Sequence, residues 1–337
     1  MKDILKIFFS NSSKMNKLKT IIGEIAKTDI TVLIKGESGT GKELVAEAIH
    51  FHSPRHPQPF IKVNCAAIPK GLLESELFGF EKGAFTGAYL KKPGKFELAN
   101  GGTILLNEIS DVDISIQAKL LQVLQDGGFS RLGGDGDIRV NTRVIATTKD
   151  HLEKSVNEGN FREDLFFRIN VISLTVPPLR DRKEQIHPLS QYFFNLYKTR
   201  YNRSIPSLSS KVINLFKEYH WPGNIRELEN LIKRAVIFGD EEIPLQEITR
   251  NQENKGSPSE ILEHFSFNTP EGKGAFDLKE VGKRAAEIAE REIIKATLQE
   301  THWNRKEAAR LLQVSYKALL YKIQKYNLQQ VGRMAKS

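Results

Sequence analysis

The sequence has a single cysteine, Cys65, among its 337 residues. One cysteine cannot form an intramolecular disulfide, so we expect a cytoplasmic protein in a reducing environment. No apolar run approaches the roughly 20 residues that a membrane-spanning helix needs, so no membrane partner is expected. The first residues, MKDILKIFFSNSSKM, lack the cleavage pattern of a signal peptide. No histidines pair at metal-binding spacing, and no pattern of a protease, nuclease or metabolic active site is present.

Acidic side chains are scarce at the end of the chain. Residues 301–337 contain eight Lys or Arg and a single acid, Glu307, in a chain whose net charge is +9. A solvated basic tail would account for this charge. Basic residues placed on a folded element would instead form an electrostatic surface for nucleic acid. The two interpretations differ in whether the segment folds.

The first two-thirds of the chain alternate short β-branched runs with helical patterns. Strands are predicted at residues 31–34, 60–65, 102–106, 142–148 and 170–176, with helices between them at 42–52 and 115–127. The strands are almost continuously apolar, which is typical of a parallel sheet covered on both faces. The predicted fold class is therefore α/β, with helices on both sides of a parallel sheet.

The remaining third of the chain favours helices and one irregular segment. Helices are predicted at residues 183–201, 209–220 and 224–238. Residues 249–276 are rich in Asn, Ser, Pro, Gly and Glu without clear periodicity, and they predict a linker. A long helix at 278–300 and the basic segment follow. The apolar positions of that long helix make it a candidate for dimerisation.

A glycine-rich motif follows the first predicted strand and opens a helix. Gly36, Gly41 and Lys42 have the phosphate-loop spacing G-x-x-x-x-G-K, in which backbone N–H groups, the helix N-terminus and the lysine bind phosphate oxygens. A glycine-rich turn without a ligand is the alternative, but spacing and context both favour a nucleotide, ATP. The residues assigned to this site are Gly36, Glu37, Ser38, Gly39, Thr40, Gly41, Lys42 and Glu43.

A second motif, Asn107-Glu108, ends the predicted strand at 102–106. In phosphate-loop enzymes the first position anchors Mg²⁺, usually as Asp, and the Glu polarises the attacking water. Asn107 keeps an acceptor oxygen but lacks the charge, and Glu43 replaces the Ser or Thr that usually binds the metal. A loss of about 1 kcal/mol or more in this interaction would weaken metal binding roughly tenfold. We therefore expect ATP to bind with Mg²⁺ held indirectly by Asn107 and Glu108, and hydrolysis to be slow.

Eight sequence blocks together resemble a known family. They are GESGTGKE, VNCAAIP, LLESELFG, GAFTGA, GGTILLNEI, FREDLFFRINV, PPLRDR and WPGNIRELEN. In this order they resemble the central AAA+ domain of bacterial enhancer-binding proteins, the sigma-54-dependent transcription activators. The carboxyl segment resembles their Fis-type helix-turn-helix. The resemblance implies an AAA+ α/β subdomain at 1–180, a helical lid at 181–248, the linker at 249–276 and a DNA-binding domain at 277–337.

The resemblance implies catalytic roles for two arginines. Arg162 and Arg168 match the family's arginine fingers, which reach a γ-phosphate bound by the adjacent subunit. The active site would then be complete only in a ring, expected to range from a dimer to a hexamer. Positive charge at the transferred phosphoryl group is worth about 10³–10⁵ in rate. A surface salt-bridge network with Glu163 and Asp164 is the alternative on spacing alone.

Three further roles come from the same resemblance. Arg226 matches the second sensor on the lid, which contacts phosphate. Asn64 matches the polar switch that holds Glu108 away from water, with a buried strand-capping asparagine as the alternative. Thr148 matches the first sensor block, in which Lys149 stands where the family usually has Asn.

The segment GAFTGA is too small-sided to build a core. Taken alone it favours a flexible glycine-rich turn. The resemblance implies that it contacts sigma-54, with the glycines as hinges, the aromatic ring as the apolar contact and the hydroxyl as the hydrogen-bonding one. The residues of this contact are Gly83, Ala84, Phe85, Thr86, Gly87 and Ala88.

Residues 304–328 predict two helices around a short turn. Ser315 fits an N-cap, and Gln313 occupies a turn position where glycine commonly relieves a left-handed backbone. The expected inner faces consist of Ala308, Ala309, Leu311 and Leu312 on the first helix and Leu319, Leu320 and Ile323 on the second. A basic hairpin that only mediates oligomerisation is the alternative to a recognition helix for double-stranded DNA. The predicted DNA contacts are Arg305, Ser315, Tyr316, Lys317, Tyr321, Lys322 and Lys325.

These features predict a DNA-bound ATPase that remodels sigma-54 RNA polymerase. A generic AAA+ unfoldase or DNA motor is one alternative, against which GAFTGA argues. A regulator that binds nucleotide with weak or no hydrolysis, because of Asn107, is the other. The resemblance begins at about residue 10, so only about 10 residues precede it. We therefore expect control by a separate regulatory protein or by expression level, unless the chain is a piece of a longer one.

Overall fold

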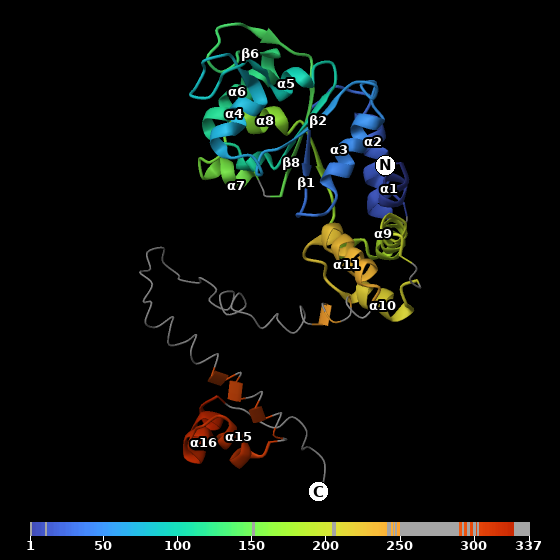
Figure 1. The fold of residues 1–337 in the computed structure, drawn as a ribbon, viewed down its shortest axis with the longest axis vertical. Helices are drawn as coiled ribbons and strands as arrows, with labels where there is room; N and C mark the ends of the chain where they lie inside the picture. Colours follow the sequence, from blue (N-terminus) through green and yellow to red (C-terminus); the bar gives the residue numbers. More distant parts are fainter. Residues whose placement is uncertain are drawn as a thin grey trace. The chain divides into compact units, whose positions relative to one another are not determined.

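The computed structural model describes two compact units, which separate after Ile248 (Figure 1). The described residues are 2–249, except 11, 150–151, 204–206, 241–243, 245 and 247, and 290–326, except 292, 295–296, 299–300 and 302. Almost all of the predicted linker at 249–276, and the first part of the predicted helix at 278–300, lie outside them.

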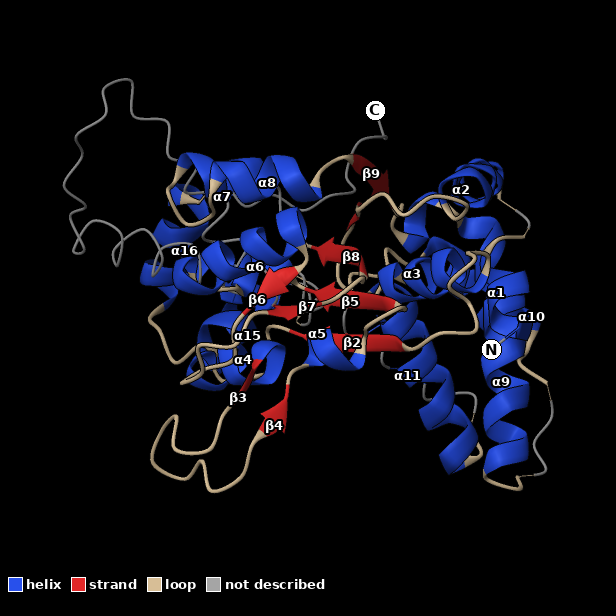
Figure 2. Ribbon diagram, turned by 90° about the horizontal axis from the view of Figure 1, so that it is seen from above, coloured by secondary structure: helices blue, strands red, loops and turns tan. Residues whose placement is uncertain are grey.

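A five-stranded parallel sheet forms the centre of the first unit (Figure 2). Its strands, in spatial order, are β2 (Phe60–Asn64), β5 (Thr103–Asn107), β8 (Arg143–Thr148), β1 (Val32–Lys35) and β9 (Ile172–Thr175). All five predicted strands are confirmed. Because they are parallel, their carboxyl ends lie at one edge, and the register places Asn64 beside Asn107 there.

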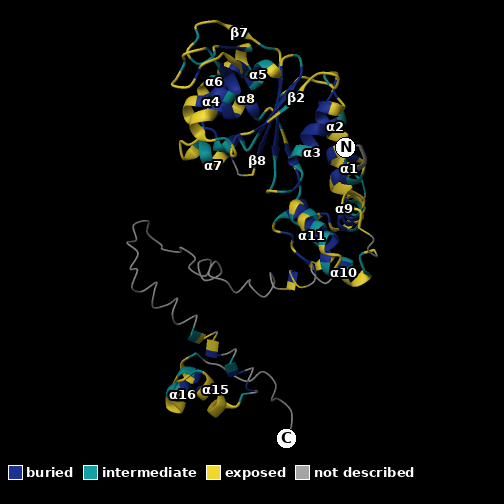
Figure 3. Ribbon diagram, viewed as in Figure 1, coloured by how far each residue is buried: buried dark blue, intermediate teal, exposed yellow. Residues whose placement is uncertain are grey.

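Helices cover both faces of this sheet. Val32 and Ile34 of β1 point into one core and Leu33 into the other, as the period of a strand requires. The first core includes α1 (Lys2–Phe8), α2 (Ser13–Ile25) and α3 (Lys42–Phe51), and the second includes α4 (Lys70–Phe78), α6 (Ile114–Asp126) and α8 (Glu163–Ile169). The inner strands β5, β8 and β1 are accordingly buried, whereas the edge strands β2 and β9 are buried only in part (Figure 3). The α/β fold class is confirmed.

A helical subdomain completes the first unit. It consists of the short 3₁₀ turns η2 (Leu179–Asp181) and η3 (Lys183–Gln185) and the helices α9 (Ile186–Arg200), α10 (Ser210–Glu218) and α11 (Asn224–Phe238). Its core is continuous with that of α1–α3. Trp221 is fully buried there, with its ring edge-on to Phe216 at 5.2 Å and its indole N–H donating to the Phe216 carbonyl at 2.7 Å.

Several short elements were not predicted. They are the hairpins β3 (Gly79–Phe80) with β4 (Lys92–Pro93) and β6 (Gly128–Phe129) with β7 (Ile138–Arg139), the helices α1, α2, α4, α5 (Lys95–Leu98), α7 (Leu152–Asn157) and α8, and the turn η1 (Ile109–Asp111). Strands of two residues are too short to carry a period of two. The helices of four to nine residues have too few turns for an apolar stripe to be recognised. The exception is α2, whose 13 residues do carry a buried stripe of Met15, Leu18, Ile22 and Ile25 that was not predicted from the sequence.

The second unit contains the two predicted helices, α15 (Arg305–Leu311) and α16 (Tyr316–Lys325). The Ser315 hydroxyl accepts a hydrogen bond from the Ala318 N–H at 3.2 Å, which confirms the N-cap, and Gln313 has the expected left-handed φ of 52°. Leu311 was placed on the inner face, and this is wrong: it is 58% exposed. It lies at the flank of the short stripe formed by Ala308, Ala309 and Leu312. No helix in the described part of the chain has the length and apolarity to cross a bilayer.

Arg182 is a fully buried cation beneath the glycine-rich loop. Its Nη2 donates to the Thr40 carbonyl at 2.5 Å, its Nη1 donates to Gln185 at 3.2 Å, and its guanidinium lies 5.0 Å from the Phe8 ring. Among the described residues no carboxylate pairs with it, and burial lowers the pKa of Arg182 to about 10. Arg182 therefore joins α1, the loop and the start of the helical subdomain through neutral acceptors.

We expect Arg182→Ala to lower the free energy of unfolding of the first unit by about 3 kcal/mol, because it leaves a cavity and unpaired buried acceptors. Urea unfolding followed by Trp221 fluorescence, in a Trp303→Phe background, measures this change. As a control, Lys14→Ala removes only an exposed pair with Asp181 and should cost about 0.5 kcal/mol or less. Equal losses in the two variants would contradict the role of Arg182.

Candidate nucleotide site

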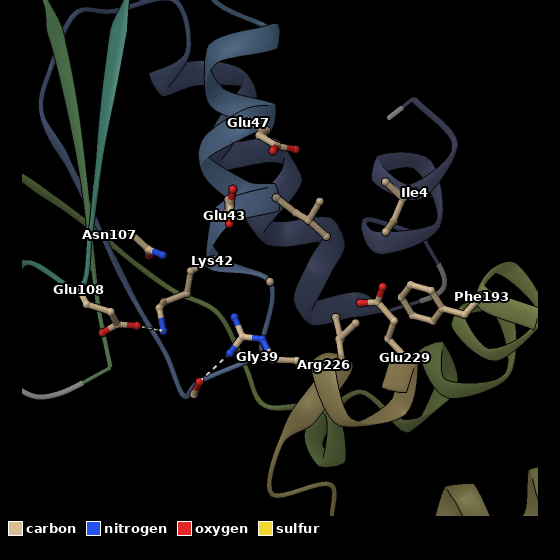
Figure 4. A pocket seen from close by; sticks show the side chains of 14 residues that line it. Ile4, Gly39, Lys42, Glu43, Glu47, Asn107, Glu108, Phe193, Arg226 and Glu229 are labelled. Carbon is tan, nitrogen blue, oxygen red and sulfur yellow. Dashed lines mark hydrogen bonds and ion pairs between the residues drawn. The ribbon is translucent and has the colours of Figure 1, made fainter. Parts of the chain in front are cut away.

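The loop at 36–42 leaves β1 at the carboxyl edge of the sheet. The Gly36 N–H donates to the Thr148 carbonyl at 3.3 Å, which ties the loop to the end of β8. Asn107 ends the next strand, β5. The phosphate loop, the end of β8 and Asn107 therefore meet at this edge, where parallel α/β sheets bind their ligands. Figure 4 shows the resulting pocket, with Lys42, Asn107 and Glu108 on its sheet side.

Two glycines of this loop are required by close contacts. Gly39 and Gly41 have φ angles of 75° and 97°. A Cβ atom at Gly39 would lie 2.4 Å from the Gly223 carbonyl oxygen, and one at Gly41 would lie 2.5 Å from the Phe8 ring. α3 begins at Lys42, directly after the loop, so its free N–H groups and the positive end of its dipole are presented to the pocket.

The Lys42 ammonium occupies the centre of the loop. It donates to the carbonyls of Gly36 at 2.7 Å and Glu37 at 3.2 Å, and it lies 3.4 Å from the Glu108 carboxylate (Figure 4). Burial lowers the pKa of Lys42, and the charge of Glu108 opposes this shift. The backbone N–H of Lys149 donates to the same carboxylate at 3.1 Å. The buried Lys42 and the half-buried Glu108 thus form a pair at the position where a phosphate and water would lie.

The amide of Asn107 is engaged within the sheet. Its side-chain oxygen accepts a hydrogen bond from the Thr147 hydroxyl. Among the described residues no group of three His, Cys, Asp or Glu side chains is placed to hold a metal ion. Mg²⁺ prefers carboxylates and phosphate oxygens. The residues present therefore do not form a magnesium site of their own.

The helical subdomain, from here on called the lid, contacts the phosphate loop through two residues of α11. The Arg226 guanidinium donates to the Ser38 hydroxyl at 3.0 Å (Figure 4). The fully buried Asn224 accepts from the Leu179 N–H at 2.8 Å and donates to the Ser38 carbonyl at 3.0 Å. Arg226 was predicted, whereas Asn224 was missed, although it lies in the same block. Its φ of 52° is a feature that the sequence does not reveal.

Arg180 is a further residue that was missed. Its two terminal nitrogens donate to the Glu37 carboxylate at 2.8 and 2.5 Å. This guanidinium holds the pKa of Glu37 below its usual value, with a smaller contribution from Asn224. Glu37, assigned from sequence only as a member of the loop, therefore connects the loop to the lid.

An apolar wall lies beside the phosphate loop. It is formed by Ile4, Leu44, Phe193 and Ile225, from α1, α3, α9 and α11 (Figure 4). Such a wall suits a flat ring next to a phosphate site. These residues are distant in sequence and belong to ordinary amphipathic helices, so no local pattern identifies them.

Asn64 lies at the end of β2, next to Asn107, and is exposed. The alternative of a buried capping asparagine is therefore wrong. In this conformation the Glu108 carboxylate contacts Lys42 and Lys149, and no hydrogen bond joins it to Asn64 among the described residues. The switch role of Asn64 stays a prediction.

The two proposed arginine fingers lie outside the pocket of their own chain. Arg162 forms an ion pair with Asp164 at 2.7 Å, part of the surface network that was the alternative, and Arg168 donates to the Leu124 carbonyl at 3.0 Å. Their action on a neighbouring subunit stays a prediction.

The segment 83–88 forms a loop between β3 and β4 that projects away from the sheet (Figure 2). Gly83 and Gly87 have φ angles of 84° and 106°, which suits the predicted hinges. Phe85 is 42% exposed and packs edge-on against Phe80 at 4.9 Å. At the base of the loop, Arg131 forms ion pairs with two glutamates, Glu81 and Glu97.

The predicted DNA-binding face is largely exposed. Arg305, Ser315, Tyr316, Lys317, Tyr321 and Lys325 are exposed. Lys322 was expected to point outward, and this is wrong: it is half-buried and forms an ion pair with Glu290. Tyr326, one turn later, donates to the same carboxylate at 2.6 Å, so this face of α16 packs against the preceding helical segment.

The fold and the loop geometry define a P-loop nucleotide-binding protein of the AAA+ type. Three family models match the chain: "Sigma-54 interaction domain" over residues 8–175, "AAA+ ATPase lid domain" over 180–261, and "Bacterial regulatory protein, Fis family" over 285–326. The chain belongs to the sigma-54-dependent enhancer-binding regulators, which combine these three parts.

Individual relatives agree with this assignment. The chain is 42% identical to the Nif-specific regulatory protein of Klebsiella pneumoniae, over 95% of this chain and 59% of that protein. It is 45% identical to the regulatory protein AtoC of Escherichia coli, over 95% of this chain and 67% of that protein. Its structure matches NtrX from Brucella abortus, solved with ADP, with a TM-score of 0.67 and 31% identity, over 94% of this chain and 68% of that one. The chain thus spans about three fifths of the Klebsiella relative.

Cys65 lies directly behind this site. It is buried, and its N–H donates to the Asn107 carbonyl at 3.0 Å. Burial, with a smaller effect of the Asp111 charge, raises the pKa of the Cys65 thiol to about 12.

A thiol with so high a pKa stays protonated at pH 8, and the thiolate is the reactive form. We expect Ellman's reagent to modify Cys65 of the folded chain about a thousandfold more slowly than that of the chain unfolded in guanidinium chloride. Absorbance at 412 nm measures both rates. Equal rates would contradict the burial of Cys65.

Proposed function

We propose that this chain hydrolyses ATP within a ring of its own copies and uses the energy to remodel sigma-54 RNA polymerase, while its carboxyl unit binds upstream double-stranded DNA. The observation that carries the proposal is the joining of two features in one subdomain. A phosphate loop with its lid lies at the sheet edge, and a glycine-flanked loop projects from the same subdomain.

The pocket supports ATP as the nucleotide. Phosphates would lie over the loop at 36–42, where Lys42 would exchange its contact with Glu108 for one with phosphate. The purine would lie against Ile4, Phe193 and Ile225. The solved complexes of NtrX with ADP and with ATP support an adenine nucleotide as the ligand. Glu108 would then orient and polarise the attacking water.

Magnesium would be held chiefly by the phosphates and by water. Asn107 offers a neutral oxygen already bonded to Thr147, so Asn107 and Glu108 would act on the metal indirectly. ATP thus remains the proposed substrate, and the protein itself contributes little to holding the magnesium ion.

The position of the proposed arginine fingers supports a ring. Arg162 and Arg168 do not line the pocket of their own chain. In a ring, Arg162 would exchange Asp164 for the γ-phosphate of the neighbour, and the site would be complete only on assembly. Control of this assembly by a separate regulatory protein belongs to the same proposal.

The exposed basic and aromatic face of α16 supports double-stranded DNA as the ligand of the carboxyl unit. Tyr316, Lys317 and Tyr321 would enter the major groove, and Lys325 and Arg305 would contact phosphates. Lys322, paired with Glu290, would instead hold α16 in place.

The proposal is tested by open-complex formation. The full chain with sigma-54 RNA polymerase and ATP should produce permanganate-reactive promoter DNA. Thr86→Ala should abolish this reactivity while ATP hydrolysis stays within about twofold, because Thr86 lies outside the pocket. Thr142→Ala, directly before β8 and at the edge of the sheet away from the site, is the matched control. Open complexes formed equally well by Thr86→Ala would overturn the assignment.

The site predicts that Asn107→Asp binds magnesium more tightly. A carboxylate at this position should lower the Mg²⁺ concentration for half-maximal phosphate release about tenfold and raise the rate at low magnesium, because charge strengthens the metal interaction by at least ~1.4 kcal/mol. Phosphate release is measured across a magnesium titration. Asn195→Asp, on the exposed face of α9, controls for added charge. Indistinguishable titrations for the original chain and Asn107→Asp would show that Asn107 does not limit hydrolysis.

A further inference from the structure

We propose that Tyr89 and Leu90, the two residues directly after the loop at 83–88, extend the contact surface for sigma-54. This inference rests on the proposed function and names additional residues of the same contact. We call Tyr89 and Leu90 the apolar tip. Its proposed partner is sigma-54.

The apolar tip is unusually exposed. Tyr89 is 81% and Leu90 78% exposed, the two highest values among the large hydrophobic side chains of the described residues. Two such neighbours on a projecting loop leave two large apolar side chains in water, which is unfavourable unless a partner covers them. The loop that carries them projects from the sheet between β3 and β4 (Figure 2).

The other large side chain of the loop is partly covered. Phe85 packs edge-on against Phe80 at 4.9 Å, and Ala88 is buried. In this conformation the apolar surface that a partner meets is therefore formed by Tyr89 and Leu90 to a greater extent than by Phe85.

The chain on the far side of the apolar tip is anchored. Lys91 lies 3.5 Å from Glu81, and Lys92 pairs with Phe80 across β3 and β4. The Tyr89 N–H donates to the Gly87 carbonyl at 2.9 Å. These contacts keep the tip next to the hinge glycines, so that any movement of the loop at 83–88 also moves Tyr89 and Leu90.

The position of the apolar tip, directly after the segment 83–88, supports sigma-54 as its partner. Residues 89 and 90 lie within the match to the sigma-54 interaction domain and directly continue the segment proposed to contact that factor. A partner surface that receives Phe85 and Thr86 therefore lies within reach of both side chains. We expect sigma-54 to offer an apolar patch to them.

The test is binding of fluorescently labelled sigma-54 to the full chain with ADP and aluminium fluoride, followed by anisotropy. Each of Tyr89→Ala and Leu90→Ala should weaken binding about tenfold, and the double variant about a hundredfold, because each loses most of one buried apolar side chain. ATP hydrolysis should stay within about twofold. Tyr89→Phe keeps the ring and should retain binding. Phe238→Ala removes a 69% exposed side chain of the lid and is the matched control.

The outcomes separate the inference from the proposed function. If Thr86→Ala fails to bind while the double variant binds normally, the apolar tip is not part of the contact and the inference is wrong. If Thr86→Ala also binds normally, the proposed function itself fails. If the double variant loses ATP hydrolysis or assembly on size-exclusion chromatography, the tip serves contacts between copies of this chain, and the inference is likewise overturned.

Discussion

The attachment of the phosphate loop to the first turn of α11 is the contact on which the rest of the site depends. Asn224 is fully buried and bonds at the same time to the loop, at Ser38, and to η2, at Leu179. The Ile225 N–H donates to the Gly39 carbonyl at 3.0 Å. A buried asparagine with several partners is costly to leave unpaired, so the loop and the lid cannot separate here without breaking several bonds at once.

This attachment has a consequence for nucleotide sensing. Arg180 donates hydrogen bonds to Glu37, and Arg226 donates one to Ser38. Two side chains of the loop are therefore bonded directly to two arginines of the lid region. A phosphate bound over the loop would compete for Arg226, which is exposed, but not for Asn224, which is buried. The Asn224 contact would therefore keep the lid on the loop while Arg226 exchanges Ser38 for phosphate. Arg182 supports the same point from below through the Thr40 carbonyl.

The strands were predictable because they are short, almost continuously apolar runs, and the predicted helices because their apolar residues recur at helical spacing. The phosphate loop and Asn107-Glu108 were predictable because their spacing is local. Asn224, Arg180 and the apolar wall were not, because their role arises where segments distant in sequence meet. Lys322 shows the converse limit: helical spacing places it on a face of α16, but Glu290, which turns that face inward, precedes it by 32 residues. Pattern thus predicts elements and local motifs, while partners across the fold require coordinates.

The loop at 83–88 differs from the phosphate loop in how it is supported. Its base is fixed by the Arg131 ion pairs, and its side meets a second hairpin, since a Cβ atom at Gly133 would lie 2.7 Å from that of Ala84. At its own glycines, by contrast, a Cβ atom at Gly83 or Gly87 would have no neighbouring atom within 4 Å. A rigid base with open space around both hinge glycines allows the tip to change direction without repacking the core. The second hairpin is joined to the loop beside this hinge, because Ala84 packs against Gly133 and the Glu81 N–H donates to the Leu132 carbonyl at 3.0 Å.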